Sequence, residues 1–200
     1  MTPVPKLLNL PNWLSLSRIA AVPVIILLLF FGQGGRITSM IAALVFLLAV
    51  LTDLVDGYLA RRYQLVTNVG RFLDPLADKL LNSASLIMLI PLNRVPAWLV
   101  FLLIGREIAV TGLRGIAAAE GVVIAASGSA KQKTLTQNIA IFCLLWHFPL
   151  FGQNTQAVGM VLLYLGLLVA YWSGYRYFVD FYRVFQSQAA QKGLDKDKGK

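Results

Sequence analysis

Charged residues, cysteine and histidine are scarce in this chain of 200 residues. Only 14% of the side chains are charged and 58% are hydrophobic, a balance that excludes an ordinary soluble domain. The single cysteine, Cys143, excludes an intrachain disulfide, and its place in an apolar run indicates a small buried hydrophobe. The single histidine, His147, has no second candidate ligand close by, so we interpret it as an interfacial residue rather than a metal ligand.

The apolar residues fall into long runs separated by short polar breaks, which is the pattern of membrane-spanning helices. A bilayer core takes about 20 apolar residues of helix, and six runs are close to that length. We therefore predict an all-α integral membrane protein with six transmembrane helices and no cleavable signal peptide. The predicted spans are residues 13–31, 37–60, 76–92, 96–119, 135–151 and 157–178. Residues 1–186 form one membrane domain in this prediction, and residues 187–200 form a polar, Lys-rich tail that we expect to be disordered.

Positive charge is distributed unevenly about these spans. If the N-terminus is cytoplasmic, the outer loops hold only Arg36 and Arg94 of the 18 Lys and Arg residues. The positive-inside rule therefore places both termini in the cytoplasm, and we expect residues 1–12 to lie along the membrane surface. The net charge of +9 favours anionic lipid headgroups and phosphorylated substrates as partners, and not nucleic acid.

Four aspartates cluster near the predicted inner ends of the second and third spans. The run D-L-V-D-G-Y-L-A-R begins at Asp53, and the run G-R-F-L-D-P-L-A-D ends at Asp78. On a helix Asp53 and Asp56 share one face, and Asp74 and Asp78, four residues apart, share another. Because the link between the two spans is short, we expect antiparallel neighbouring helices whose acidic faces converge.

Carboxylates that lie this close together in a membrane require compensation, and divalent cations supply it well. An all-oxygen ligand set without His or Cys favours Mg²⁺ or Mn²⁺ over zinc, and a pair of such ions suits an in-line phosphoryl displacement. Gly57, Ala60 and Gly70 lie on the same faces as the acids and would leave room for a substrate beside the helix backbone. The alternative is a helix-packing seam for the small residues and simple salt bridges for the acids.

The complete pattern, D-x2-D-G-x2-A-R-x8-G-x3-D-x3-D from Asp53 to Asp78, resembles the signature of the CDP-alcohol phosphatidyltransferase family. This family cleaves the pyrophosphate of a CDP-linked lipid and joins the lipid phosphate to an alcohol. The resemblance implies that Asp78 is the general base, and that two Mg²⁺ or Mn²⁺ ions are held by Asp53, Asp56, Asp74 and Asp78. It implies that the CDP moiety is bound by Gly57, Ala60, Arg61 and Gly70. It also implies a homodimer in the inner (plasma) membrane, with CDP-diacylglycerol as donor and an active site that faces the cytoplasm.

Three further segments are similar to bacterial family members that make phosphatidylglycerophosphate: N-L-P-N-W-L-S-L-S-R from Asn9, G-R-E-I-A-V-T-G-L-R from Gly105, and K-Q-K-T from Lys131. The implied acceptor is glycerol 3-phosphate, whose dianionic phosphate needs cationic donors. The residues expected to bind it are Arg18, Arg106, Arg114, Lys131 and Lys133. Glu107 is expected either to orient an arginine or to form a simple salt bridge.

Two other functions are compatible with these features. The same chemistry could use another acceptor alcohol, such as phosphatidylglycerol in a cardiolipin-type synthase. A divalent-cation transporter, which belongs to a different class, would also place carboxylates in the membrane. Against transport, the acids gather at one face, and no chain of polar residues crosses the predicted bilayer.

Overall fold

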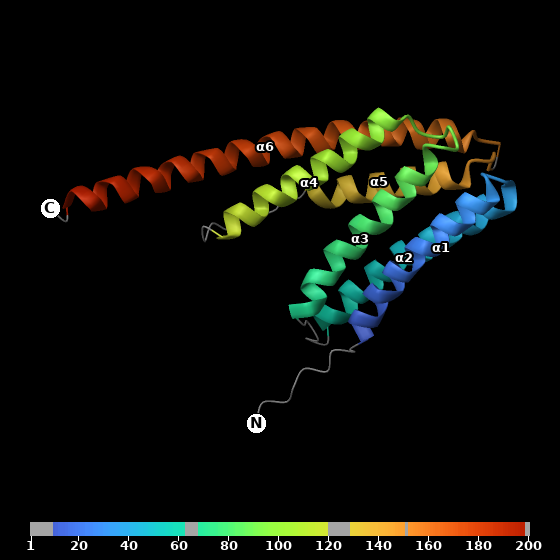
Figure 1. Cartoon of the computed structure of the whole chain (residues 1–200), viewed down its shortest axis with the longest axis horizontal. Coiled ribbons are helices and arrows are strands. Elements are labelled where there is room, and N and C mark those ends of the chain that lie inside the picture. The colour runs from blue at the N-terminus through green and yellow to red at the C-terminus, as the bar shows by residue number, and fades with distance from the viewer. Residues whose placement is uncertain (1–9, 63–67, 120–128, 151, 199–200) are drawn as a thin grey trace, which may run out of the picture. The chain divides into compact units, whose positions relative to one another are not determined.

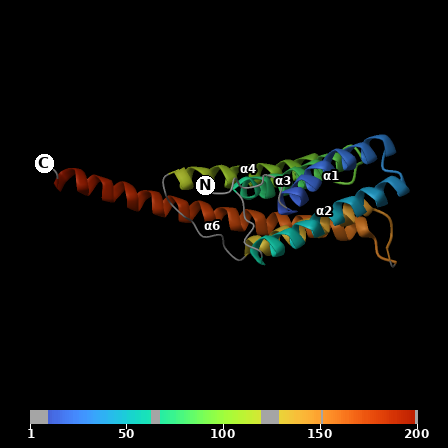
Figure 2. The ribbon, with the colours of Figure 1, turned by 90° about the horizontal axis from the view of Figure 1, so that it is seen from below.

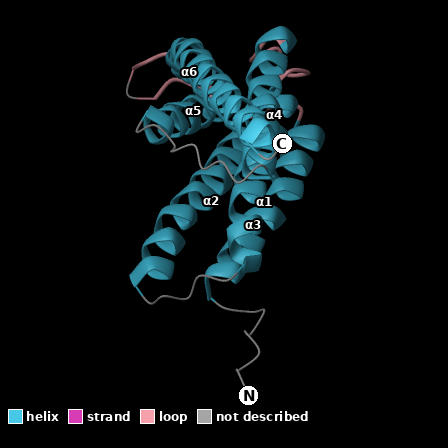
Figure 3. Ribbon diagram, turned by 90° about the vertical axis from the view of Figure 1, so that its left-hand side faces the viewer, coloured by secondary structure: helices cyan, strands magenta, loops and turns pink. Residues whose placement is uncertain are grey.

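The computed structural model describes residues 10–62, 68–119, 129–150 and 152–198. Within these ranges some side chains lie outside the description, chiefly those of residues 53–62, 68–72, 129–133 and 187–198. The described residues form six α-helices (Figures 1 and 3). They are α1 Leu10–Gly32, α2 Arg36–Arg62, α3 Asn68–Leu89, α4 Ala97–Ala119, α5 Ser129–Trp146 and α6 Thr155–Lys198. Each predicted span overlaps one of these helices, so the all-α prediction is confirmed. Residues 1–9, including most of the segment predicted to lie along the membrane surface, are outside the described residues.

The last helix is longer than predicted. α6 is a single helix of 44 residues that continues to Lys198, through most of the tail that we expected to be disordered (Figure 2). The expectation of disorder rested on polar composition alone. Gln, Ala and Lys are good helix formers, and adding residues to an existing helix avoids the cost of nucleating a new one. The polar tail is therefore helical up to Lys198.

Two helices in the described part of the chain are long and apolar enough to cross a bilayer, through Ser15–Gly32 in α1 and Thr155–Arg183 in α6. Shorter apolar stretches are Arg36–Thr52 and Thr134–Trp146. Only 22% and 28% of the residues in the two long stretches are buried, whereas the core helix of a soluble protein would be mostly buried. Large apolar side chains therefore face outward from these helices, as a lipid-facing surface requires.

The chain divides into two compact units. The first comprises residues 1–100 and 137–163, and the second comprises residues 101–136 and 164–200. In the first unit α1 packs along both α2 and α3, which meet each other only briefly among the described residues. We predicted that α2 and α3 would be antiparallel neighbours, and the two helices do contact each other. The end of α2 that carries Asp53 and Asp56 lies outside the described side chains, so the convergence of the acids stays a prediction. All three helices bury apolar side chains, such as Leu29, Phe46 and Leu81.

α5 and α6 approach closely at Gly159, within the first unit. A Cβ atom at this position would lie 2.7 Å from Cγ of Leu144 and 3.1 Å from the Ala140 carbonyl oxygen, and both of these residues are fully buried. We expect Gly159→Ala to lower the free energy of unfolding by about 1–3 kcal/mol, since extra volume in a packed contact forces neighbours apart. Equilibrium unfolding in detergent would measure this change. Gly166→Ala is the control, because a Cβ there meets nothing within 4 Å; an equal loss in both variants would contradict the packing argument.

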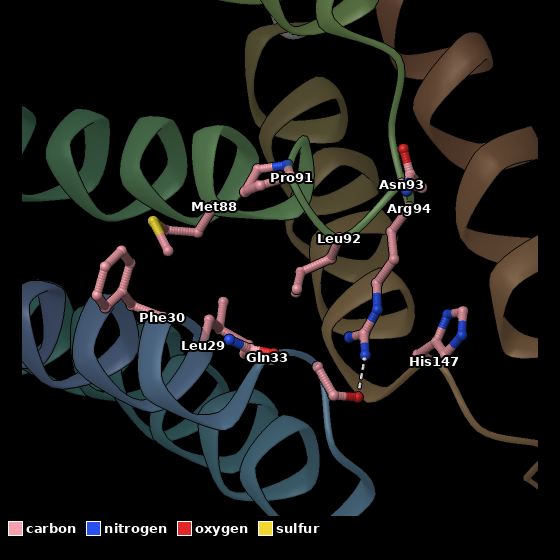
Figure 4. Close-up of a pocket in the computed structure, with 10 residues that line it drawn as sticks. Leu29, Phe30, Gln33, Met88, Pro91, Leu92, Asn93, Arg94 and His147 are labelled. Carbon is pink, nitrogen blue, oxygen red and sulfur yellow. Dashed lines mark hydrogen bonds between the residues drawn. The ribbon is translucent and has the colours of Figure 1, made fainter.

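Three helices of the first unit, α1, α3 and α5, end near residues with positive φ: Gln33 (43°), Asn93 (56°) and His147 (63°). Such left-handed residues commonly end helices and leave carbonyl groups of the last turn without partners in the helix. All three residues line one cavity of about 550 Å³, together with Gly34 and Arg94 (Figure 4). The ends of these helices therefore meet around a single polar cavity.

Arg94 supplies hydrogen bonds to these helix ends. Its side chain is buried, and Nη1 donates to the carbonyl oxygens of Leu144 at 3.3 Å and Leu145 at 2.9 Å. Nη2 donates to the Gly34 carbonyl oxygen at 2.9 Å, as Figure 4 shows, and to Ser39 Oγ at 2.8 Å. We predicted only that Arg94 would lie in an outer loop. The structure shows that one guanidinium joins the end of α5 to the connection between α1 and α2.

Candidate active site

Asp74 and Asp78 lie one turn apart on α3, and their side chains are partly exposed. Asp74 contacts α1: Ser15 Oγ donates a hydrogen bond to its Oδ1, and Nη2 of Arg18 lies 3.4 Å from the same oxygen. Asp78 contacts its own helix, since Asn82 Nδ2 donates to its Oδ1 at 3.2 Å. One oxygen of each carboxylate is thus held by a neighbouring donor.

Asp74 has an oxygen suited to a divalent cation. Its side chain is 47% exposed, and no described residue donates a hydrogen bond to Oδ2. Mg²⁺ and Mn²⁺ bind hard carboxylate oxygens, so the donor type and its exposure fit such an ion. Among the side chains that the structure describes, no three His, Cys, Asp or Glu residues gather into a metal site.

The remaining signature residues are placed only as parts of helices. Gly70 lies in the first turn of α3, and the last turns of α2 contain Asp53, Asp56, Gly57, Ala60 and Arg61. The side chains of these residues are outside the described set, as residues 53–72 are. Convergence of the four aspartates, and contact of the small residues with CDP, therefore stay predictions.

Arg18 belongs to the residues predicted to bind the acceptor phosphate. Its side chain is only 1% exposed, and the guanidinium contacts Asp74. A buried charge costs several kcal/mol unless it is paired, and the carboxylate of Asp74 provides part of the pairing. Arg18 therefore contacts a predicted metal ligand, and its binding of the acceptor phosphate stays a prediction.

The other described candidates for phosphate binding lie in the second unit, where Arg106 and Arg114 both contact α6. Arg106 Nε donates to the Ala170 carbonyl oxygen at 2.8 Å, and the Arg114 guanidinium stacks over the Tyr177 ring, 5.4 Å from its centroid. Glu107 Oε1 forms an ion pair with Arg106 Nη1 at 3.0 Å, which confirms that the glutamate pairs with an arginine.

The two arginines differ in how much of their hydrogen-bonding capacity is used. Arg106 is nearly buried and is bonded through Nε and Nη1, whereas Arg114 is exposed and held through the face of its guanidinium. Stacking leaves the N–H edges of a guanidinium available for a phosphate. Lys131 and Lys133 belong to the first turns of α5, and their side chains are outside the described set. Arg114 is therefore the described residue best suited to bind an anion.

Sequence reasoning missed two partners of the aspartates. Asn82 follows Asp78 by four residues on α3, and this helical spacing was a signal that could have indicated the contact. Ser15 lies 59 residues from Asp74 in the sequence, and no local pattern connects them. Only the packing of α1 against α3 brings this pair together.

The helical fold, the outward apolar surface and the pair Asp74 and Asp78 on one face of α3 define a helical protein with partly exposed carboxylates on one helix. Residues 8–172 match the family described as CDP-alcohol phosphatidyltransferase, so this chain belongs to that family of enzymes. It is 43% identical over 180 residues to the CDP-diacylglycerol–glycerol-3-phosphate 3-phosphatidyltransferase of Bacillus subtilis (strain 168), over 85% of this chain and 93% of that protein.

Other relatives carry the same name or a related one. The Rickettsia bellii (strain RML369-C) protein of the same name is 40% identical over 173 residues, covering 85% of this chain and 93% of that protein. A cardiolipin synthase (CMP-forming) of Oryza sativa subsp. japonica is 37% identical over 199 residues, covering 91% of this chain but 60% of that protein. Similarity thus extends nearly end to end with the two bacterial proteins and over only part of the plant one.

Proposed function

We propose that this chain transfers the phosphatidyl group of CDP-diacylglycerol to glycerol 3-phosphate, giving phosphatidylglycerophosphate and CMP. The observation that carries the proposal is the 43% identity over 93% of the Bacillus subtilis protein, whose name states this donor and acceptor. The complete aspartate pattern from Asp53 to Asp78 supports the chemistry. The rice cardiolipin synthase is the main argument for a different acceptor, and its match covers only 60% of that protein.

The reaction breaks a phosphoanhydride bond and forms a phosphate ester bond. The acceptor hydroxyl oxygen forms a bond to the phosphorus of the lipid phosphate, the bond from that phosphorus to the CMP oxygen breaks, and Asp78 takes the hydroxyl proton. In this proposal the chain holds two Mg²⁺ or Mn²⁺ ions through Asp53, Asp56, Asp74 and Asp78. The bound ions would neutralise the pyrophosphate and so make CMP a better leaving group. Gly57, Ala60, Arg61 and Gly70 would hold the CDP moiety.

We further propose that the chain is a six-span protein of the inner (plasma) membrane that works as a homodimer. The outward apolar side chains of α1 and α6 and the scarcity of positive charge in the outer loops support the membrane placement, whereas the homodimer rests on the family resemblance alone. Both termini and the aspartates would face the cytoplasm, where glycerol 3-phosphate is dissolved. CDP-diacylglycerol would reach the site from the bilayer.

A panel of acceptors tests the proposed function. Purified protein in detergent or nanodiscs would receive CDP-diacylglycerol, Mg²⁺ or Mn²⁺, and one acceptor at a time: glycerol 3-phosphate, phosphatidylglycerol, serine or inositol phosphate. We expect the product mass of phosphatidylglycerophosphate, with CMP in equal amount. Conversion of phosphatidylglycerol without conversion of glycerol 3-phosphate would overturn the choice of acceptor, and absence of CMP with every acceptor would overturn the reaction.

Arg114 provides a specific prediction within this proposal. Charged hydrogen bonds to a phosphate contribute about 1.5–3 kcal/mol, so Arg114→Gln should raise the KM for glycerol 3-phosphate roughly 10- to 100-fold. The KM for CDP-diacylglycerol should change little, because the lost contact is with the acceptor. Steady-state kinetics with each substrate varied would measure both values. Arg176→Gln, at an exposed arginine of α6, is the matched control. Equal changes in both KM values would argue against an acceptor role for Arg114.

A further inference from the structure

Two side chains of α1 meet one oxygen of Asp74, a residue of α3. Ser15 Oγ donates a hydrogen bond to Asp74 Oδ1, and Arg18 Nη2 lies 3.4 Å from the same atom. Ser15 is 0% exposed and Arg18 is 1% exposed, whereas the Asp74 side chain is 47% exposed. The donors are thus fixed in the packed interior of the first unit, while the carboxylate that they hold reaches its surface.

Both donors act on the same carboxylate oxygen. Oδ1 has two bonding partners, and Oδ2 has no hydrogen-bond donor among the described residues. Hydrogen bonds that only join two helices do not require the acid to be half exposed, as the Asp74 side chain is. A carboxylate that binds an ion requires one oxygen that the protein orients and a second oxygen that is available to the ion. The contacts of Asp74 have this arrangement.

We propose that Ser15 and Arg18 are positioning residues, which hold Asp74 through Oδ1 so that Oδ2 can bind a divalent cation. The inference rests on the proposed function, because Asp74 is a metal ligand only in that proposal. It gives Arg18 a role different from phosphate binding. It also explains why a hydroxyl and a guanidinium are fully buried, one helical turn apart, on the side of α1 that faces α3.

The two donors contribute in different ways. The Ser15 hydroxyl is neutral, so it orients the carboxylate without competing electrostatically with a cation. The Arg18 guanidinium also attracts the carboxylate of Asp74, but its positive charge opposes the cation. Substitution of Ser15 therefore tests the positioning without changing the local charge. Substitutions of Arg18 should keep the positive charge.

The test measures direct binding of Mn²⁺ to the full-length protein in nanodiscs that contain no lipid substrate. The electron paramagnetic resonance signal of free Mn²⁺ reports how much of the ion is bound. Loss of a hydrogen-bond donor to a metal ligand lowers metal affinity about 10- to 100-fold. We expect a weakening of this size for Ser15→Ala, recovery for Ser15→Thr, which restores the hydroxyl, and a several-fold loss for Arg18→Lys. Arg18→Lys also keeps the test informative if Ser15→Ala fails to fold.

Two other serines serve as controls. Ser85→Ala removes a buried hydrogen bond on α3, from Ser85 Oγ to the Leu81 carbonyl oxygen at 2.8 Å, without touching Asp74. Ser17→Ala removes an exposed hydroxyl on α1, two residues from Ser15. Both variants should bind Mn²⁺ like the wild type, although Ser85→Ala should lower the thermal midpoint.

Each outcome decides the proposal. Wild-type Mn²⁺ affinity in folded Ser15→Ala and Arg18→Lys would overturn it, and so would an equal loss in Ser85→Ala, which would show that only stability had changed. Failure of the wild type to bind Mn²⁺ would also overturn it. Failure of the proposed function is a separate result, since it is absence of CMP and phosphatidylglycerophosphate in the acceptor panel. A protein that binds Mn²⁺ through Ser15-dependent positioning but makes neither product would keep this inference and lose the proposed reaction.

Discussion

Asp78→Asn is expected to lower the rate of CMP release by at least about a thousandfold, with the protein still folded. An amide cannot take the acceptor proton, and general-base catalysis contributes about 10²–10⁴-fold to a rate. In the proposed site the variant also exchanges an anionic metal ligand for a neutral one. Its folding should be little affected, because Asn82 Nδ2 now donates to Asp78 Oδ1 at 3.2 Å and an amide oxygen at that position can accept the same bond.

Single-turnover release of CMP from CDP-diacylglycerol, measured beside Mn²⁺ binding, would separate the two roles of Asp78. We expect turnover to be lost while Mn²⁺ binding is weakened only in part, because Asp53, Asp56 and Asp74 remain. Asp180→Asn, at an exposed aspartate of α6, is the control and should keep wild-type turnover. Near-normal turnover in Asp78→Asn would remove this residue from the base role. Complete loss of both turnover and metal binding would assign it to ligation alone.

The positions of the helices could be predicted from the sequence because each depends on a local property. A run of about 20 apolar residues specifies a helix long enough for a bilayer, and a short polar break ends it. The spacing of Asp74 and Asp78 is equally local, since α3 places residues four apart on one face. The prediction failed at the tail, where the polar composition indicated disorder. α6 continues there as a helix to Lys198.

Contacts between helices could not be predicted from local patterns. The short link between α2 and α3 predicted neighbouring helices, and they do contact each other, but no local pattern indicated that α1 packs along both of them. The contact of Ser15 with Asp74 follows from this packing, across 59 residues of sequence. The aspartate pattern identified the candidate acids, whereas the packing of α1 against α3 identified the donors to Asp74.

The role of Arg94 was equally hidden, because a lone arginine in a loop looks like a surface charge. Burial lowers the pKa of its guanidinium from the ordinary value, but an arginine remains charged at any ordinary pH. The charge has carbonyl and hydroxyl partners in place of a carboxylate. Carbonyl groups at the C-terminal end of a helix carry partial negative charge, so the end of α5 stabilises the guanidinium, and the guanidinium bonds to otherwise unpaired carbonyls.

Arg94→Met is therefore expected to lower the free energy of unfolding by about 3–5 kcal/mol, because each buried acceptor that loses its donor costs about 1–3 kcal/mol. The loss leaves the carbonyl oxygens of Gly34, Leu144 and Leu145 without this donor. For a chain of this length each kcal/mol shifts the thermal midpoint by roughly 2–4 °C. The midpoint should fall by roughly 6–20 °C, as measured by thermal unfolding in detergent.

Arg36→Met is the matched control, because Arg36 belongs to the same unit but is exposed, with its guanidinium stacked 5.6 Å from the centroid of the Phe148 ring. An exposed cation–π contact contributes about 0.5–1 kcal/mol, so this midpoint should move by only a few degrees. Arg94→Lys should fall between the two, since one ammonium group cannot reach both Gly34 and the end of α5 with the geometry of a planar guanidinium. Similar losses in Arg94→Met and Arg36→Met would show that the buried hydrogen bonds contribute no more than a surface contact. A large fall in the thermal midpoint only in the Arg94 variants would show that this guanidinium stabilises the contact between the end of α5 and the connection from α1 to α2.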